Sequence, residues 1–175
     1  YKKKVNKIIY KDLSNLVLNN NAINLIDVNY NQKFAFEKIS NKSKVYVEKC
    51  FNIAFKIIKL GLSNKLINGP ISKKKFLNKK FLGMTEYISK NFSIDSSAML
   101  IFNKKLSVCP LTTHLPLKLV SKKINKSLIK TNVKLIDSFY KSHLNFKPKI
   151  AVTGLNPHCE SNQILNEDEK IIKPA

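Results

Sequence analysis

The sequence predicts an α/β protein built on a mixed, mostly covered sheet. Short apolar runs typical of strands alternate with longer amphipathic stretches of helical period, which is the pattern of α/β domains. Glycine, proline and asparagine residues mark most of the changes from one pattern to the other. No run approaches the ~18 uninterrupted apolar residues that a membrane-spanning helix requires, so we expect no membrane partner.

Two elements of the first half carry clear signals. Residues 22–28 alternate in the manner of a strand, and the Asn-rich segments around them are typical of turns. Across residues 43–60 apolar side chains recur at helical spacing, with Ser43 as the expected N-cap and Gly61 as the stop. A short apolar run at 65–68 then meets a Gly-Pro turn, which predicts a strand followed by a βα junction.

The rest of the chain continues the alternation. A polar turn at 103–105 separates two apolar runs, which predicts a hairpin. Thr85 is placed to cap a helix, and the acidic residues at 167–169 suit the first turn of another because of the helix dipole. Residues 73–80 are expected to form a short basic helix or a turn. Further helices are expected at 85–90, 117–124, 127–143 and from 167 onward, and strands at 98–102, 106–111 and 149–153.

We find no internal repeat, no low-complexity linker and no internal domain boundary. We therefore assign no internal boundary within residues 1–175, and the family resemblance described below implies that they are the central part of a larger protein. The chain opens on Tyr1 rather than on methionine, and it stops at Ala175 inside an expected helix, so truncation at both ends is expected.

The net charge of +21 raises the question of nucleic-acid binding. All 32 basic residues are lysine, whereas base reading and bidentate phosphate recognition both favour arginine. The lysines are scattered through every segment, and lysine, asparagine and isoleucine are over-used together, as an AT-rich coding bias would produce. We therefore expect no nucleic-acid partner, although a basic surface would attract a small phosphorylated substrate.

The three cysteines indicate a reducing compartment. Their number is odd and no CxxC spacing occurs, which fits a cytoplasmic protein better than a disulfide framework. Cys50 lies in an apolar helical run and is expected in the core. Cys159 directly follows a histidine, and a metal-ligand role for it is the less favoured alternative.

Two of the three histidines end expected strands. His114 and His158 each follow an apolar run, and ligands of open α/β sheets bind at the carboxyl ends of the strands. Two neutral imidazoles brought there could share one divalent metal, although catalysis needs a third ligand. The alternative is two unrelated loop histidines, each bonded to nearby backbone. His143, near a helix end, is expected to be a helix C-terminal cation or a surface residue.

Two further positions are candidates for binding an anion. Lys73 follows a Gly-Pro turn after an expected strand, and such a turn with a lysine can cradle an anionic group. A simply solvated lysine is the plainer interpretation. The hydroxyl of Thr85, near a helix start, could bind phosphate, or it could only cap its own helix.

Four motifs in order point to a family. They are NGPISK at 68–73, GMTEY at 83–87, TTHLPL at 112–117 and GLNPH at 154–158. In this order, and from the helix at Ser43 to the end of the chain, the sequence resembles the 4-hydroxythreonine-4-phosphate dehydrogenases.

The resemblance implies an α/β/α sandwich similar to the isocitrate and isopropylmalate dehydrogenases, in a homodimer with a shared active site. It implies a divalent metal (Zn²⁺, Mg²⁺ or Co²⁺) held by three histidines, two of which correspond to His114 and His158. The third belongs to a later segment of the other subunit. NAD or NADP would oxidise 4-phosphooxy-threonine to a 3-oxo acid, which decarboxylates to 3-amino-2-oxopropyl phosphate in pyridoxal phosphate synthesis. Cofactor-binding residues are expected beyond Ala175.

The sequence departs from the family pattern in two places. Met84 occupies a position where the family has a substrate-contacting histidine, while Thr85 keeps the neighbouring threonine as a substrate-binding residue. Residues 159–163 replace the glycine-rich stretch that follows the second metal histidine. Two alternatives therefore stay open. One is a related dehydrogenase of phosphorylated four-carbon sugar acids, and the other is an inactive fragment of the family.

Overall fold

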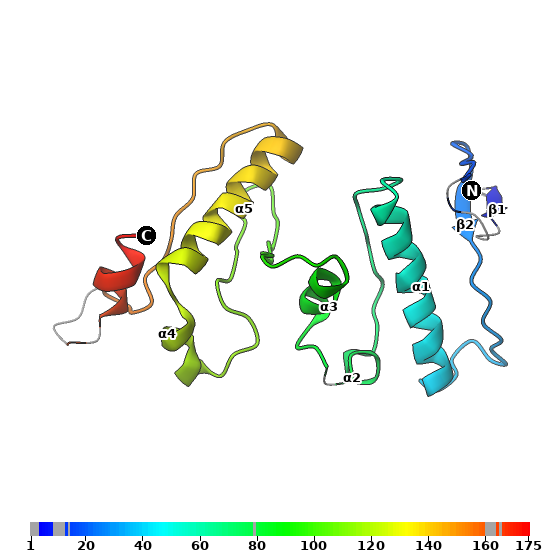
Figure 1. Ribbon diagram of the computed structural model, residues 1–175, viewed down its shortest axis with the longest axis horizontal. Coiled ribbons are helices and arrows are strands. Elements are labelled where there is room, and N and C mark those ends of the chain that lie inside the picture. Colours follow the sequence, from blue (N-terminus) through cyan, green and yellow to red (C-terminus); the bar gives the residue numbers. More distant parts are fainter. Residues whose placement is uncertain (1–3, 9–12, 14, 79, 160–163, 165) are drawn as a thin grey trace. The chain divides into compact units, whose positions relative to one another are not determined.

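The computed structural model describes residues 4–8, 13, 15–78, 80–159, 164 and 166–175. The chain forms two compact units, Tyr1–Tyr87 and Ile88–Ala175. The chain contains helices and a small sheet, as expected for an α/β protein, but the expected alternation is not seen among the described residues, because two strands are followed only by helices. Figure 1 labels most of these elements. The elements are β1 (Val5–Ile8), β2 (Ile23–Ile26), α1 (Asn41–Lys59), α2 (Lys73–Phe76), α3 (Met84–Asn91), η1 (Leu117–Leu119), α4 (Val120–Lys123), α5 (Lys126–Leu144) and η2 (Asp168–Ile172).

The strands of the first unit form a two-stranded parallel sheet. β1 pairs with β2 in a register that sets Val5 opposite Ile23, and the Asn6 carboxamide donates to Asn24 Oδ1 at 2.9 Å. Side-chain exposure alternates along both strands, as a period of two requires. The strand expected at 22–28 is thus confirmed, whereas β1 was not expected.

Helix α1 confirms the helix expected at 43–60, but its cap differs. Ser40 is the N-cap, and Ser43 sits at the third helical position. The two serines form a reciprocal capping box: Ser40 Oγ accepts from Ser43 N at 3.3 Å, and Ser43 Oγ accepts from Ser40 N at 2.9 Å. Gly61 follows the helix with a φ of 73°, the left-handed conformation that commonly ends helices.

An aromatic cluster forms the core of the first unit and fixes the start of α3. Phe51 and Phe55 lie on the inner face of α1 and are buried. The Tyr87 ring lies edge-on to Phe51 and Phe76, with centroids 5.6 and 5.1 Å apart, and Phe81 contacts Tyr87 at 5.4 Å. Such edge-to-face pairs stabilise beyond the area they bury. The cluster therefore anchors α3 through its fourth residue, next to the motif at 83–87.

Two expectations for the first unit are wrong. Thr85 does not cap α3, because the helix already begins at Met84 and its first turn is closed by Tyr87 N donating to the Gly83 carbonyl. Residues 65–68 form no strand in the described part of the chain, and Ile67 is 96% exposed. A strand needs a hydrogen-bonded neighbour, which this short run does not have among the described residues.

Helix α5 organises the second unit. Asn125 caps it by accepting a hydrogen bond from Leu128 N at 2.9 Å, and Asn145 ends it in the left-handed conformation. The helix holds the preceding segment through polar contacts: Tyr140 Oη donates to Ser107 Oγ at 2.8 Å, and Cys109 Sγ lies 3.7 Å from the Oδ1 of buried Asn132. The helix expected at 127–143 is confirmed.

The three strands expected in the second unit are not formed in the described residues. The expected hairpin is reduced to one antiparallel bridge between Ile101 and Val108. Pro110 has no backbone N–H to donate, so the ladder cannot continue through it. Residues 149–153, also not a strand, line an open hollow of about 800 Å³ beside α5, and Val152 is 50% exposed.

The remaining helices follow the sequence more closely. η1 and α4 together cover the helix expected at 117–124. The helix expected from residue 167 is a single π-helical segment, η2, closed by Lys173 N donating to the Asp168 carbonyl at 2.8 Å. Among the helices of the described residues, none combines the length and apolarity needed to cross a membrane.

Candidate functional site

His114 lies in a loop of the second unit, between the bridge residue Val108 and η1, and its side chain is exposed. Its backbone is left-handed, with a φ of 56°. That conformation is uncommon for a residue with a side chain, and strained backbone of this kind clusters at functional sites. The loop replaces the strand end that the sequence had predicted for this residue.

His158 lies in a tight turn of the same unit. Cys159 N donates to the Asn156 carbonyl at 3.0 Å, which closes a four-residue turn with Pro157 and His158 at its centre. Proline suits the second position of such a turn because its φ is already fixed near the required value. The next residue, Cys159, is left-handed with a φ of 55°. The His158 side chain is exposed.

A buried carboxylate holds the base of this turn. Asp168, only 3% exposed, accepts from Leu155 N at 2.7 Å through Oδ1. Its Oδ2 accepts from Asn156 N at 3.2 Å and from Asn156 Nδ2 at 2.6 Å. The Asn156 carboxamide, helped by the two backbone amides, holds the pKa of Asp168 below its ordinary value although burial acts to raise it.

Gly154 completes the packing of the turn. A Cβ atom at this position would lie 2.4 Å from Cys159 Sγ and 2.9 Å from Asp168 Oδ1, closer than any side chain tolerates. The absence of a side chain therefore lets the two ends of the turn and the carboxylate approach one another. The contact between the turn and Asp168 could not be predicted from the sequence, because its hydrogen bonds join residues that lie 12 and 13 positions apart.

His114 and His158 are both exposed residues of the second unit, and neutral imidazole is a common ligand of divalent cations. Neither His114 nor His158 has a hydrogen-bond partner among the described residues, so the alternative in which backbone groups satisfy them finds no support there. No group of three His, Cys, Asp or Glu side chains suited to a metal occurs in the part of the chain that the structure describes. A complete site therefore needs a further ligand from outside these residues.

The third histidine and the cysteines take other places. His143 lies in the last turn of α5, where its ring stacks on Phe139 at 5.0 Å and Nδ1 lies 2.8 Å from Ser142 Oγ. This matches the expected helix-terminal role. All three cysteines are free, Cys50 is half-buried and Cys159 is exposed. Burial raises the pKa of the Cys109 thiol.

The predicted substrate-binding residues belong to the first unit. Met84 and Thr85 open α3 and are half-buried, and Lys73 opens the short helix α2 and is exposed. The next residue, Glu86, was not singled out from the sequence. Its Oε2 atom is shielded from solvent without a hydrogen-bond partner among the described residues.

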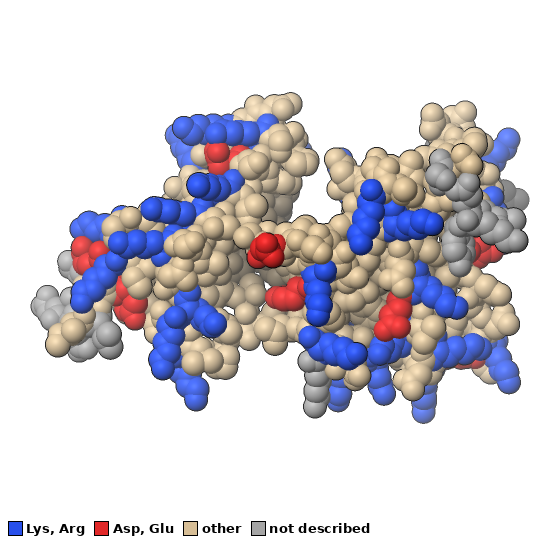
Figure 2. Space-filling model, in the orientation of Figure 1, with Lys and Arg blue, Asp and Glu red and all other residues tan. Residues whose placement is uncertain are grey.

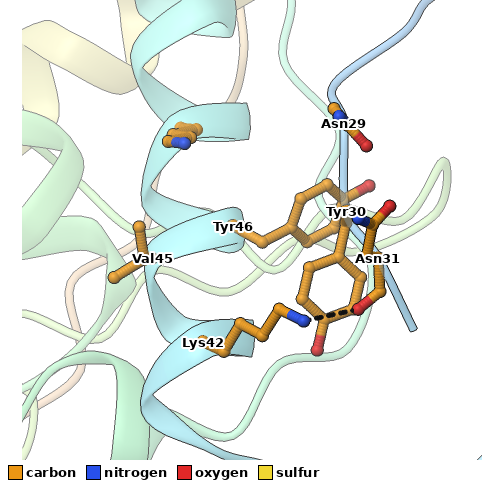
Figure 3. Close-up of a pocket in the computed structure, with 7 residues that line it drawn as sticks. Asn29, Tyr30, Asn31, Lys42, Val45 and Tyr46 are labelled. Atoms are coloured by element: carbon orange, nitrogen blue, oxygen red, sulfur yellow. Dashed lines mark hydrogen bonds between the residues drawn. The ribbon is translucent and has the colours of Figure 1, made fainter. Parts of the chain in front are cut away.

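A separate hollow of about 360 Å³ in the first unit contains none of the predicted residues. Tyr30 stacks on Tyr46 at 4.6 Å, and Lys42 Nζ donates to the Asn31 carbonyl at 2.7 Å, as Figure 3 shows. The hydrogen bond with Cys50, and then burial, raise the pKa of Tyr46. The larger hollow of the second unit is lined in part by Gly154 and Leu155, at the base of the His158 turn, but not by His114 or His158.

Lysine side chains occur on both units of the face shown in Figure 2, with a few acidic side chains among them. The ion pairs found among the described residues are at least partly exposed, and three of them join residues four apart on one helix. Such pairs contribute little to stability. The main effect of the lysines is therefore expected to be the summed positive potential around the protein, which attracts anionic ligands, rather than stabilisation by individual ion pairs.

Comparison with known proteins gives a family and close relatives. The family model described as pyridoxal phosphate biosynthetic protein PdxA matches residues 2–175. A 4-hydroxythreonine-4-phosphate dehydrogenase of Sulfurihydrogenibium sp. is 37% identical over 157 residues, covering 87% of this chain and 48% of that protein. A D-threonate 4-phosphate dehydrogenase of Pectobacterium atrosepticum is 28% identical over 130 residues, covering 73% of this chain and 40% of that protein.

The fold is shared with solved structures. The crystal structure of a 4-hydroxythreonine-4-phosphate dehydrogenase from Klebsiella pneumoniae aligns with a TM-score of 0.77 at 22% identity, covering 99% of this chain and 55% of that one. The chain spans about half the length, or less, of the curated relatives it matches. Because the family model covers nearly the whole sequence, the chain belongs to the PdxA family of pyridoxal phosphate biosynthetic proteins.

Proposed function

We propose that this chain is part of a metal-assisted, NAD- or NADP-dependent dehydrogenase that oxidises 4-phosphooxy-threonine in pyridoxal phosphate synthesis. The observation that carries the proposal is a pair of histidines, His114 and His158, that have no hydrogen-bond partner among the described residues. Both lie in motif loops of the second unit: His114 is itself left-handed, and His158 precedes the left-handed Cys159. Membership of the family and the names of the relatives support the reaction class.

The proposed reaction converts the substrate's secondary alcohol to a 3-oxo acid, which loses carbon dioxide to give 3-amino-2-oxopropyl phosphate. His114 and His158 would hold the divalent cation with a third ligand from outside the described residues. Bound there, the cation would supply Lewis-acid stabilisation of negative charge on the substrate's oxygen.

Residues of the first unit would bind the substrate's phosphate. Thr85 lies in the first turn of α3, where backbone N–H groups and the helix dipole favour an anion. Lys73 is exposed and can supply a positive charge. The wider frame that we propose is an α/β/α sandwich similar to the isocitrate and isopropylmalate dehydrogenases, in a cytoplasmic homodimer with a shared site.

A second candidate substrate is a phosphorylated four-carbon sugar acid such as D-threonate 4-phosphate. It is supported by a relative of that name and by Met84 in the position where the family motif has histidine. The altered segment after His158 also bears on substrate choice, but its residues 160–163 lie outside the described part of the chain. An inactive homologue is the remaining alternative.

The test is a turnover assay on the complete gene product with added Zn²⁺, Mg²⁺ or Co²⁺. Reduction of NAD and NADP is followed with 4-phosphooxy-threonine and with D-threonate 4-phosphate. We expect turnover of the first substrate, reduced to background in His114→Ala and His158→Ala and retained in the control His143→Ala. Faster turnover of D-threonate 4-phosphate would select the second substrate. Full activity of both alanine variants would contradict the metal role, and inactivity of the wild type on both substrates would contradict the dehydrogenase.

A further inference from the structure

We infer that Asp168 is a positioning residue that holds the turn carrying His158 in its ligand-binding shape. The inference rests on the proposed metal role of His158. In this inference Asp168 contacts neither the substrate nor the metal. It acts on His158 indirectly, through hydrogen bonds to the backbone of Leu155 and Asn156.

The hydrogen bonds of Asp168 all converge on the start of the turn. One carboxylate oxygen accepts from Leu155 N, and the other accepts from both the backbone and the side chain of Asn156. Asn156 is in turn the first residue of the turn closed by Cys159 N, so the backbone of His158 lies inside a hydrogen-bonded turn. Holding Asn156 in place therefore restricts the backbone position from which the imidazole extends.

The carboxylate itself stands on a fixed base. Asp168 begins η2, and its carbonyl accepts from Lys173 N at 2.8 Å. Just before it, Asn166 accepts from Glu169 N at 3.1 Å through its side chain, and its carbonyl accepts from Lys170 N. At Gly154 a Cβ atom would collide with both the Asp168 carboxylate and Cys159 Sγ, so the backbone of the turn lies close to both side chains. The turn thus packs against the residue that begins η2.

Charge explains why an acid occupies this position. Burying a carboxylate is costly unless hydrogen bonds compensate it, and no ion pair of Asp168 occurs among the described residues. Its compensation comes from three N–H donors of the turn, which only an acceptor without a proton can satisfy together. An asparagine in its place would set an NH₂ group against at least one of these donors.

The consequence concerns metal affinity. A ligand whose loop is already ordered loses less conformational entropy when it binds a cation. Residues that orient metal ligands typically change affinity by about 10- to 100-fold when they are replaced. We therefore expect replacement of Asp168 to loosen the turn and to weaken binding at His158 by that factor.

The experiment compares Asp168→Asn with Asp137→Asn in the complete gene product. The control removes one negative charge from the same unit, at a partly exposed carboxylate that pairs with Lys141 on α5. Hydrogen exchange of the Leu155 and Asn156 amides is measured without metal, and Co²⁺ binding is measured by calorimetry. We expect Asp168→Asn to speed the exchange of these amides and to weaken Co²⁺ binding about 10- to 100-fold. The control should change neither.

Three outcomes would overturn the inference, and they are distinguishable. Unchanged exchange of both amides in Asp168→Asn would show that the carboxylate does not hold the turn. Faster exchange with wild-type Co²⁺ affinity, while His158→Ala weakens binding, would show that the turn does not position the ligand. Wild-type Co²⁺ affinity in His158→Ala would refute the proposed metal role itself, and the positioning role with it.

A milder variant covers the case in which Asp168→Asn does not fold. Asn156→Ala removes only the side-chain hydrogen bond and leaves both backbone amides to the carboxylate. It should raise exchange at residues 155 and 156 and weaken Co²⁺ binding by a smaller factor, with unchanged exchange in α5. Wild-type values for both measurements would overturn the inference in the same way.

Discussion

At the scale of the residue, left-handed backbone occurs both at helix ends and in two motif loops. Five non-glycine residues of the described part have positive φ. Asn78, Ser93 and Asn145 follow the ends of α2, α3 and α5, where this conformation is the ordinary way to end a helix. His114 and Cys159 end no helix and lie instead in the two motif loops that carry the proposed metal ligands. Their left-handed conformation is therefore not explained by helix termination, and it is consistent with the proposed site.

The Asp168 carboxylate predicts a dependence of stability on pH. Its pKa is lower in the folded than in the unfolded chain, so its contribution to stability is present above the unfolded value of about 3.9. That contribution is lost as the pH falls through the folded pKa. A protonated aspartic acid and an asparagine have similar hydrogen-bonding groups, so Asp168→Asn should destabilise the protein at neutral pH and progressively less below about pH 4.

Chemical denaturation of the wild type and Asp168→Asn across this pH range measures the effect. Asp137→Asn serves as the control for loss of one negative charge from the same unit. A difference in unfolding free energy between wild type and Asp168→Asn that stayed constant from neutral to acidic pH would contradict the assigned role.

Met84 gives a prediction about substrate binding. A thioether cannot donate a hydrogen bond, whereas the imidazole that the resembled motif has at this position can. Met84 is half-buried at the start of α3, so Met84→His can place a donor there. A hydrogen bond to a charged group contributes about 1.5–3 kcal/mol, and we expect KM for the phosphorylated substrate to fall roughly tenfold or more. Met84→Leu should leave KM near the wild-type value. An unchanged or raised KM in Met84→His would indicate a pocket rebuilt around methionine.

At the scale of the element, α5 supports the segment that leads to His114. Its N-cap, Asn125, accepts from Leu128 N, so Asn125→Ala leaves that donor without its partner. We expect a loss of about 1 kcal/mol in unfolding free energy, measured by urea titration. Ser127→Ala, an exposed change in the same first turn, should cost much less. Equal losses in both variants would mean that the cap contributes nothing.

The long helices were predictable from the sequence, whereas of the expected strands only the one at 22–28 is formed among the described residues, because helices and strands depend on different information. The apolar period and the local caps specify α1 and α5 within a few residues, even though the cap of α1 proved to be Ser40. Strands depend on neighbours that lie far apart in the sequence. The runs at 98–102 and 106–111 therefore looked like a hairpin, but they meet only at the bridge between Ile101 and Val108.

The same distinction holds for the candidate site. The histidines, Met84 and Thr85 were evident from short motifs, because a motif is local. The role of Asp168 depends on a contact across 12 and 13 residues that no spacing indicates. The shielded Oε2 atom of Glu86 was equally invisible before side chains were placed.

At the scale of the whole molecule, the motifs are divided between the two compact units. The first unit carries Lys73, Met84 and Thr85, and the second carries His114 and His158. The chain also spans about half the length, or less, of its curated relatives. The proposed function is therefore that of the complete gene product, in which the third metal ligand and the cofactor site are proposed to lie outside this chain.

The most direct test of the central claim, that His114 and His158 share one cation, is the zinc content of the complete gene product. Wild type, His114→Ala, His158→Ala and the control His143→Ala are loaded with Zn²⁺, desalted and measured by atomic absorption. We predict bound zinc in the wild type and in His143→Ala, and its loss from the other two variants with the fold preserved. Wild-type zinc content in both His114→Ala and His158→Ala would contradict the claim.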